Sequence, residues 1–190
     1  MPTPTQDLRD HLRTRTAAAH RDAEASVDLN AALTDRDTYA AYLHRMRAWH
    51  RAIEPTVWDA LDAERWSWWT DHRRRVLDRL DADLAALPAP AADEAPPPPP
   101  VAAGPAAALG VAYVVQGSGV GAQIIARRAR QRLGPDLPAG FLHHAAGADA
   151  DPPVWPRFIA ALNASEADPA AALRGADAAF ASFGAYLVGG

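Results

Sequence analysis

The sequence predicts an all-α fold, and three observations support it. Apolar residues recur at helical spacing along most of the chain, beginning with Leu8, Leu12, Ala19 and Ala23. No segment alternates apolar and polar residues over the length of a β-strand. Proline and glycine cluster between the periodic stretches, where they end helices. At 190 residues the chain can bury one substantial core, so we predict a single domain over residues 1–190.

The composition excludes several classes of function. The net charge is −4, which gives no reason to expect binding to nucleic acid or to a membrane surface. There is no cysteine, so disulfides, thiolate metal ligands and cysteine nucleophiles are excluded. All 19 cationic residues are arginine, so a bound anion must be held by arginine, hydroxyl groups or backbone N–H groups. The N-terminus has no apolar signal core and no apolar run approaches about 18 residues, so we expect a cytoplasmic protein without a membrane partner.

The N-terminal half of the chain predicts three helices. The first spans residues 5–24, with no glycine or proline inside it. A connector over residues 26–33 leads to the second helix, which starts at Thr34 and ends or kinks near Pro55. Thr70 is expected to cap the third helix, whose leucines form one apolar stripe.

A proline-rich segment follows the third helix. Residues 88–105 hold eight of the 17 prolines, five of them in a row. Such a run favours polyproline II and cannot enter a packed helix. We interpret it as an exposed loop between helices, either a tolerated surface insertion or a docking peptide for a proline-binding module.

The C-terminal part of the chain predicts two further helices after a central glycine-rich segment. Glycine and proline over residues 134–140 end the central segment. Residues 141–151 are expected to form a loop, and residues 152–162 a short helix. Asp168 and Pro169 are typical of an N-cap and a first helical position, so they predict the start of the last helix.

The central segment, residues 113–128, admits two interpretations. In one, residues 112–115 form a strand, and the spacing of Gly117, Gly119 and Ala122 matches a dinucleotide-binding fingerprint. That motif needs a parallel sheet, and the sequence offers no second strand. In the other interpretation the whole segment is one long helix with glycines at its centre. The second interpretation explains more of the sequence.

Glycines inside a helix require a reason, because each costs about 1 kcal/mol relative to alanine. Gly117 and Gly121 are four residues apart and share one helical face, so together they expose a patch of backbone. Close packing against another helix would explain them. A flat ligand lying against the backbone would explain them as well.

A flat prosthetic group with a metal would need a ligand from the opposite side, and His20 is the best candidate. Glu24 follows one turn later and can accept a hydrogen bond from the imidazole, while Arg13 lies seven residues earlier on nearly the same face. The alternative is a surface histidine with an ion-paired glutamate. His50, which is followed by Glu54, is the reserve ligand. No histidine spacing suggests a zinc or di-iron site.

These segments resemble a known family, the biliverdin-producing haem oxygenases, and in particular its bacterial branch. Residues 12–24 resemble the proximal helix of the family, and residues 106–128 resemble its distal helix. Residues 155–162 and 179–183 resemble a Trp-x-x-Phe segment and the closing helix. The resemblance covers nearly the whole chain and implies a haem-oxygenase-like helical bundle with a glycine-kinked distal helix.

The resemblance implies a role for each residue of the two main motifs. His20 corresponds to the axial iron ligand and Glu24 to its hydrogen-bonding partner. Arg13 matches a cationic position that pairs with a haem propionate. Gly117 and Gly121 correspond to the flexible distal surface above the iron.

Two features of the distal motif differ from the animal enzymes. Ser118 matches a position where those enzymes have an aspartate that supports distal water, and bacterial members often have serine. Ala122 replaces the second glycine of the usual pair and adds a methyl group close to haem.

The C-terminal cations that hold propionates in the animal enzymes have no clear match; Arg157, Arg127 and Arg128 are the available substitutes.

The activity implied is the opening of haem to biliverdin, CO and Fe²⁺. Haem would serve as substrate and cofactor, O₂ as oxidant, and an external ferredoxin or flavin reductase as electron donor, because the chain has no flavin, iron–sulfur or reliable dinucleotide motif. Two alternatives remain: a non-catalytic haem or tetrapyrrole binder, which Ala122 makes credible, and a helical interaction domain without a ligand.

Overall fold

The structure is a computed structural model that describes residues 7–88, 104–145, 147 and 153–187. Within these residues every regular element is a helix, so the all-α prediction is confirmed. The helices are α1 (Leu8–Arg15), α2 (Ala17–Ala25), α3 (Leu29–Ala32), α4 (Arg36–Ala60), α5 (Ala63–Ala85), α6 (Pro105–Leu133), α7 (Gly140–Ala145), α8 (Val154–Asn163) and α9 (Pro169–Leu187).

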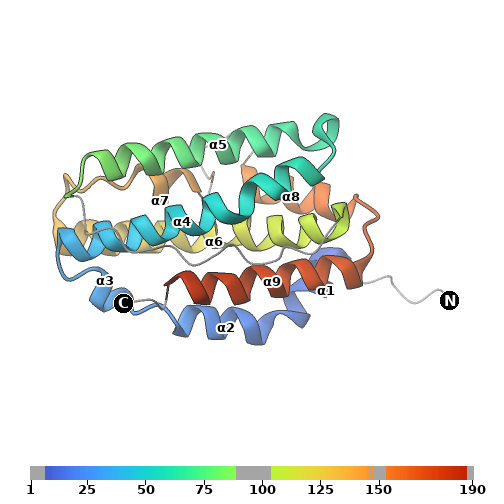
Figure 1. The fold of residues 1–190 in the computed structure, drawn as a ribbon, viewed down its shortest axis with the longest axis horizontal. Coiled ribbons are helices and arrows are strands. Elements are labelled where there is room, and N and C mark those ends of the chain that lie inside the picture. The colour runs from blue at the N-terminus through green and yellow to red at the C-terminus, as the bar shows by residue number, and fades with distance from the viewer. Residues whose placement is uncertain (1–6, 89–103, 146, 148–152, 188–190) are drawn as a thin grey trace.

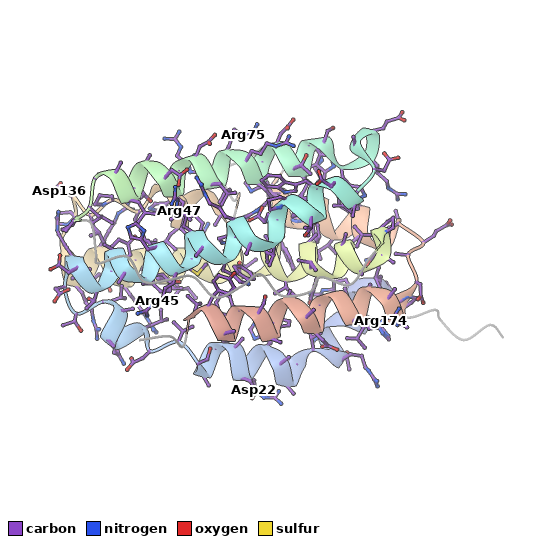
Figure 2. The ribbon with its side chains drawn as sticks, viewed as in Figure 1. Asp22, Arg45, Arg47, Arg75, Asp136 and Arg174 are labelled. Carbon is purple, nitrogen blue, oxygen red and sulfur yellow. The ribbon has the colours of Figure 1, made fainter. Side chains whose placement is uncertain are left out.

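The long helices α4, α5, α6 and α9 lie roughly along one direction, with α6 at the centre (Figure 1). Helix α6 contacts α9, α7, α4 and α8, and α2 packs on the outer side of α9. Charged side chains such as Asp22, Arg75 and Arg174 are exposed and project from the outer faces of the bundle (Figure 2). The bundle therefore buries much of one central helix and places most of its charged side chains outside.

Helix α6 is one continuous helix across the glycine-rich segment. The strand that a dinucleotide site would need, residues 112–115, lies inside it and is helical. By length and composition alone α6 is the one described helix that could cross a membrane, but more than half of its most apolar stretch is buried inside the fold. That burial is typical of a core helix.

Close packing of α6 against α9 depends on two glycines. A Cβ at Gly110 would lie 1.8 Å from the carbonyl oxygen of Ala172, and one at Gly175 would lie 2.0 Å from the carbonyl oxygen of Ala107. Neither position can hold a side chain without moving a backbone. The close-packing explanation for glycine therefore holds at this crossing.

Aspartates begin three of the long helices. The side chain of Asp35 accepts from the backbone N–H of Thr38 and forms a capping box with it, and Asp62 caps α5 through the backbone N–H of Arg65. Asp168 accepts from two backbone N–H groups at the start of α9, which confirms the predicted Asp-Pro start. The predicted caps at Thr34 and Thr70 are wrong, each because an aspartate earlier or later in the sequence makes the cap.

Two helix boundaries differ from the prediction. Thr70 lies inside α5, where its hydroxyl donates to the carbonyl of Ser67. The predicted first helix is divided at the buried Thr16, whose hydroxyl donates to the carbonyl of Leu12 at 2.8 Å. A threonine that bonds to the carbonyl four residues earlier bends a helix, and here it separates α1 from α2.

Two predicted loops contain short helices. The connector over residues 26–33 includes α3, which Asp28 caps. The segment expected to be a loop from residue 141 belongs to α7, whose first two backbone N–H groups, on Gly140 and Phe141, donate to the buried carboxylate of Asp83 on α5. A cap supplied by a side chain 57 residues away has no local signal in the sequence.

The predicted proline-rich loop falls mainly on residues 89–103, which lie outside the described residues. Its flanks agree with the prediction, since α5 ends at Ala85 and α6 begins at Pro105. Pro55 is accommodated inside α4, which continues to Ala60.

We expect Gly175→Ala to destabilise the protein by at least about 2 kcal/mol, because the new methyl group overlaps the backbone of α6. Gly184→Ala is the matched control on the same helix, since nothing lies within 4 Å of its Cβ position. That variant should gain about 0.5–1 kcal/mol from helix propensity. Thermal unfolding followed by circular dichroism measures both. Equal melting temperatures for the two variants would contradict the close contact.

Candidate functional site

A cavity of about 700 Å³ lies between α2 and α6 and is closed by α4, α7, α8 and α9. Its lining comprises His20, Ala23 and Glu24 on α2, Tyr42 and Met46 on α4, Phe141, Leu142 and Ala145 on α7, Trp155 on α8, Phe180 and Phe183 on α9, Val27 and Leu29 around α3, and much of α6 between Tyr113 and Ile125. Most of these side chains are apolar or aromatic.

His20 is the histidine among the residues that line this cavity. Its Nδ1 lies 3.5 Å from Oε2 of Glu24, at the outer limit of a hydrogen bond, and both side chains are more than half exposed. The edge of the Phe180 ring packs against the imidazole, with ring centroids 5.7 Å apart. Because Glu24 faces Nδ1, the second ring nitrogen remains available to a ligand.

The α6 side of the cavity is formed by backbone. A Cβ at Gly121 would meet nothing within 4 Å, and one at Gly117 would reach only the ring of Trp155 at 3.8 Å. Packing against another helix therefore does not explain these two glycines, unlike Gly110. A ligand in the cavity does explain them, because bare backbone lets a flat molecule approach α6 closely.

Other α6 residues shape the same surface. The hydroxyl of Ser118 donates to the carbonyl of Val115 at 2.8 Å, which leaves its oxygen lone pairs free to accept. The methyl group of Ala122 is buried and lines the cavity. Val120 and Ile124 are about half exposed, which is unusual for large apolar side chains and indicates an apolar rim.

Six of the residues predicted from the sequence line this one cavity: His20, Glu24, Gly117, Ser118, Gly121 and Ala122. The predicted kink of α6 at its glycines stays a prediction.

Arg13 is not among the lining residues. The bend at Thr16 separates its helix from α2, and its Nε lies 3.5 Å from the carboxylate of Asp10. Burial raises the pKa of Tyr113, which lines the cavity, while the charges of Arg9 and Arg13 oppose that rise. Arg13 therefore lies near the Tyr113 end of the cavity rather than inside it.

The substitute cations do not line the cavity either. The guanidinium of Arg157 stacks 3.9 Å above the ring of Trp68. Arg127 borders a separate surface depression with Arg130 and His143. His143 belongs to α7 and contacts Arg130, so the predicted loop from residue 141 is wrong at this position.

Several lining residues escaped the sequence analysis. Tyr42 and Met46 belong to an apolar stripe of α4, and periodicity alone does not separate a stripe that faces the core from one that faces a cavity. Phe141 and Leu142 were assigned to a loop. For Tyr42 and Met46, helical spacing was the only pattern in the sequence. For Phe141 and Leu142, which lie in the predicted loop, the sequence has no pattern that indicates a cavity.

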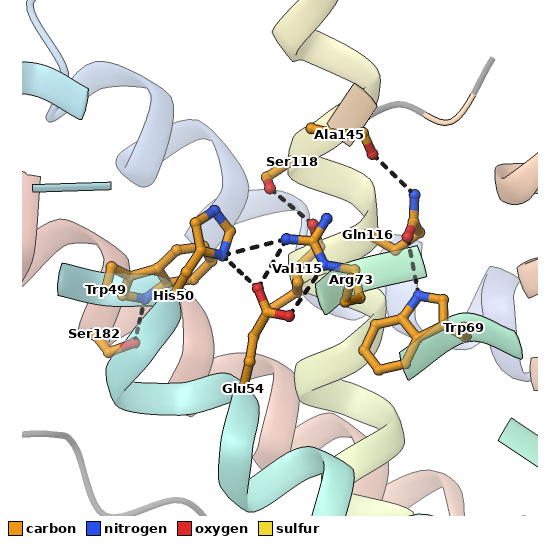
Figure 3. A network of polar contacts seen from close by, with 10 residues as sticks. All are labelled: Trp49, His50, Glu54, Trp69, Arg73, Val115, Gln116, Ser118, Ala145 and Ser182. Atoms are coloured by element: carbon orange, nitrogen blue, oxygen red, sulfur yellow. Dashed lines mark hydrogen bonds and ion pairs between the residues drawn. The ribbon is translucent and has the colours of Figure 1, made fainter. Parts of the chain in front are cut away.

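His50, the reserve ligand, lies in a buried ionic network instead of the cavity (Figure 3). Its Nδ1 lies 2.8 Å from Oε1 of Glu54, and the guanidinium of Arg73 donates to both carboxylate oxygens of Glu54, at 2.8 and 3.1 Å. All three side chains are at most 1% exposed. Burial lowers the pKa of His50 despite Glu54, so the imidazole is neutral and donates from Nδ1.

The charge on Glu54 is maintained by its partners. Burial raises the pKa of this carboxyl, but the charge of Arg73 and the hydrogen bonds from His50 and Arg73 outweigh burial and lower it to about 2. The network joins α4 to α5. A second buried contact joins α5 to α6 and α7: Gln116 accepts from Nε1 of Trp69 at 2.9 Å and donates to the carbonyl of Ala145 at 3.3 Å (Figure 3).

Comparison with known proteins gives two findings. The family model described as "Heme oxygenase" matches residues 6–188. A protein named "Heme oxygenase" from Xanthomonas campestris pv. campestris (strain 8004) is 42% identical over 152 residues, which cover 78% of this chain and 88% of that protein.

We expect Glu54→Gln to lower the free energy of unfolding by about 3–5 kcal/mol at pH 7, because it leaves Arg73 as an unpaired buried charge. Urea unfolding measures the loss, and Glu64→Gln, at an exposed position on α5, is the control. The pKa of Glu54 is depressed, so its contribution is complete above about pH 4.5 and disappears as the pH falls towards about 2. The difference in unfolding free energy between wild type and Glu54→Gln should therefore decrease as the pH falls through this range. A difference that does not change with pH would contradict the ionic role of Glu54.

Proposed function

The chain belongs to the haem oxygenase family, and we propose that it opens haem to biliverdin, CO and Fe²⁺ in the cavity between α2 and α6. The observation that carries the assignment of the site is the pairing of His20 and Glu24 on one wall with the bare backbone at Gly117 and Gly121 on the other. The volume of about 700 Å³ lies in the usual range for ligand cavities, about 300–1,000 Å³, and the lining is largely apolar. These residues fit a flat iron porphyrin.

Haem supplies the iron and the oxidisable ring, and O₂ and electrons come from outside the protein. His20 binds the iron through Nε2. Glu24 accepts the Nδ1 proton, which fixes the tautomer and increases the basicity of the ligand nitrogen. Phe180 restricts the orientation of the imidazole by packing its edge against the ring.

The α6 wall performs the distal functions. Gly117 and Gly121 would admit the porphyrin close to the backbone, because neither carries a side chain and only the Trp155 ring lies within 4 Å of their Cβ positions. The hydroxyl of Ser118 has committed its proton to the carbonyl of Val115, so towards a water in the cavity it acts as an acceptor. It would therefore orient such a water by accepting one of its protons and leaving the other directed into the cavity. The apolar neighbours exclude other water.

The haem carboxylates belong at the Tyr113 end of the cavity. Arg9 and Arg13 act on Tyr113 through their charge, so this end combines a phenol with two guanidinium groups. Arginine pairs well with carboxylates. Asp10 bonds to Arg9 at 2.8 Å and competes for these cations.

A ferredoxin or flavin reductase supplies the electrons in this proposal, and O₂ is the co-substrate. A cytoplasmic location and the absence of a nucleic-acid or membrane partner are part of the same proposal. The family match from residue 6 to residue 188 supports a single domain that includes the proline-rich segment.

Replacing the proposed iron ligand tests the site directly. We expect His20→Ala to shift the Soret band of the haem complex and to reduce biliverdin formation by more than about 100-fold, beyond the loss caused by removing only a hydrogen-bonding partner of a ligand. Absorbance after addition of haem, ascorbate and O₂ measures both. His144→Ala, on the exposed side of α7, should behave as wild type. An unchanged Soret band in His20→Ala would reject the ligand assignment.

Replacing Ala122 tests whether its methyl group hinders turnover. We expect Ala122→Gly to retain or increase biliverdin formation, at a stability cost of about 1 kcal/mol from helix propensity. Ala126→Gly, one turn later on α6, is buried and does not line the cavity, so it should show the stability cost alone. A large fall in turnover in Ala122→Gly but not in Ala126→Gly would show that the methyl group positions the porphyrin.

A further inference from the structure

Tyr42 brings to the cavity a hydroxyl that has no hydrogen-bond partner among the described residues. Its side chain is only 6% exposed and lines the cavity beside Met46 and Phe141. The hydroxyl makes no hydrogen bond to the described residues, whereas the hydroxyl of Tyr39, one turn earlier, donates to the carbonyl of Pro138 at 3.0 Å. The oxygen itself is not fully buried, so the hydroxyl can donate to a ligand in the cavity.

Tyr42 and Tyr113 lie at different ends of the cavity. Tyr113 contacts Trp155 on α8 and senses the charges of Arg9 and Arg13. Tyr42 lies towards α7, together with Phe141. Helix α8 lies beside the N-terminal half of α6 and α7 beside its C-terminal half (Figure 1). The Tyr113 end therefore lies near two arginines and Asp10, and the Tyr42 end presents apolar side chains and one phenol.

The chemistry of the substrate gives this phenol no acceptor. With its carboxylates at the Tyr113 end, haem places only methyl, vinyl and ring C–H groups at the Tyr42 end. Ring opening at the bridging carbon that faces Tyr42 changes this, because that carbon leaves as CO and each of the two pyrrole carbons beside it acquires a lactam oxygen. Burial raises the pKa of Tyr42, so the phenol stays protonated and acts as a donor.

We propose that the Tyr42 hydroxyl recognises the product, by donating a hydrogen bond to a lactam oxygen of the linear tetrapyrrole. This inference rests on the proposed function. Tyr42 is a binding residue for biliverdin and contributes no polar contact to haem. It favours retention of the product after the ring has opened, while apolar contacts at the same position serve both molecules.

The test compares binding of product and substrate to the full-length, haem-free protein. Biliverdin and haem are each titrated against wild type and Tyr42→Phe, and quenching of tryptophan fluorescence is followed. The variant should bind biliverdin about 3- to 10-fold more weakly, the loss expected for one neutral hydrogen bond, and should bind haem within about twofold of wild type. Tyr113→Phe is the matched control, and its effect on the two ligands should be equal.

A second measurement detects the hydrogen bond itself. The lactam carbonyl stretch of bound biliverdin, observed by infrared difference spectroscopy, should move to higher frequency in Tyr42→Phe and stay unchanged in Tyr113→Phe. The proposal would be overturned if Tyr42→Phe weakened the binding of biliverdin and haem equally. It would also be overturned if the variant changed neither the biliverdin affinity nor the lactam carbonyl frequency. Wild-type turnover in the haem and ascorbate assay is scored separately, so a failure of the proposed function is distinguishable from a failure of this inference.

Discussion

Helix α6 must present bare backbone at two levels along its length, on nearly the same face, and much of the architecture follows from that requirement. Towards α9 its Gly110 allows two backbones to approach within contact of one another, with Gly175 making the reciprocal approach. Towards the cavity, Gly121 leaves open space and Gly117 faces only the ring of Trp155. Each interior glycine costs about 1 kcal/mol of helix stability, so α6 is intrinsically weak for its length. Burial on several sides offsets this, because apolar burial contributes about 25 cal/mol per Å².

The polar contacts around the cavity hold its walls at fixed positions. Gln116 links α6 to α5 and α7, and Asp83 links α7 to α5, so the α7 wall is tied down at both ends. The network of His50, Glu54 and Arg73 then joins α5 to α4 behind the cavity. Buried ion pairs are not strongly stabilising compared with apolar packing, and their value lies in specifying one arrangement of the helices. That specificity suits an enzyme whose substrate must be held in one orientation.

The sequence was sufficient where the determinants are local. Helical periodicity located the long helices, the Asp168–Pro169 pair located the start of α9, and the spacing of His20 and Glu24 located the imidazole wall. It was insufficient where the determinants are tertiary. Helix α7 depends on a carboxylate from α5, and the bend at Thr16 depends on a hydroxyl that could equally have faced solvent. The role of each α6 glycine could not be predicted for the same reason. Only the atoms packed around it show that Gly110 contacts another helix and that Gly121 does not.

The cavity is chemically unequal at its two ends, and that inequality gives direction to the reaction. A carboxylate bound at the arginine end gains charge-assisted contacts that cost little, since Arg9 and Arg13 lie near the surface. The phenol of Tyr42 at the apolar end is a hydrogen-bond donor, so it favours a ligand that brings an acceptor atom there. The substrate brings no such atom to that end, and the product does. In this proposal the phenol at the Tyr42 end favours the state after ring opening, whereas the arginines at the Tyr113 end serve substrate and product alike.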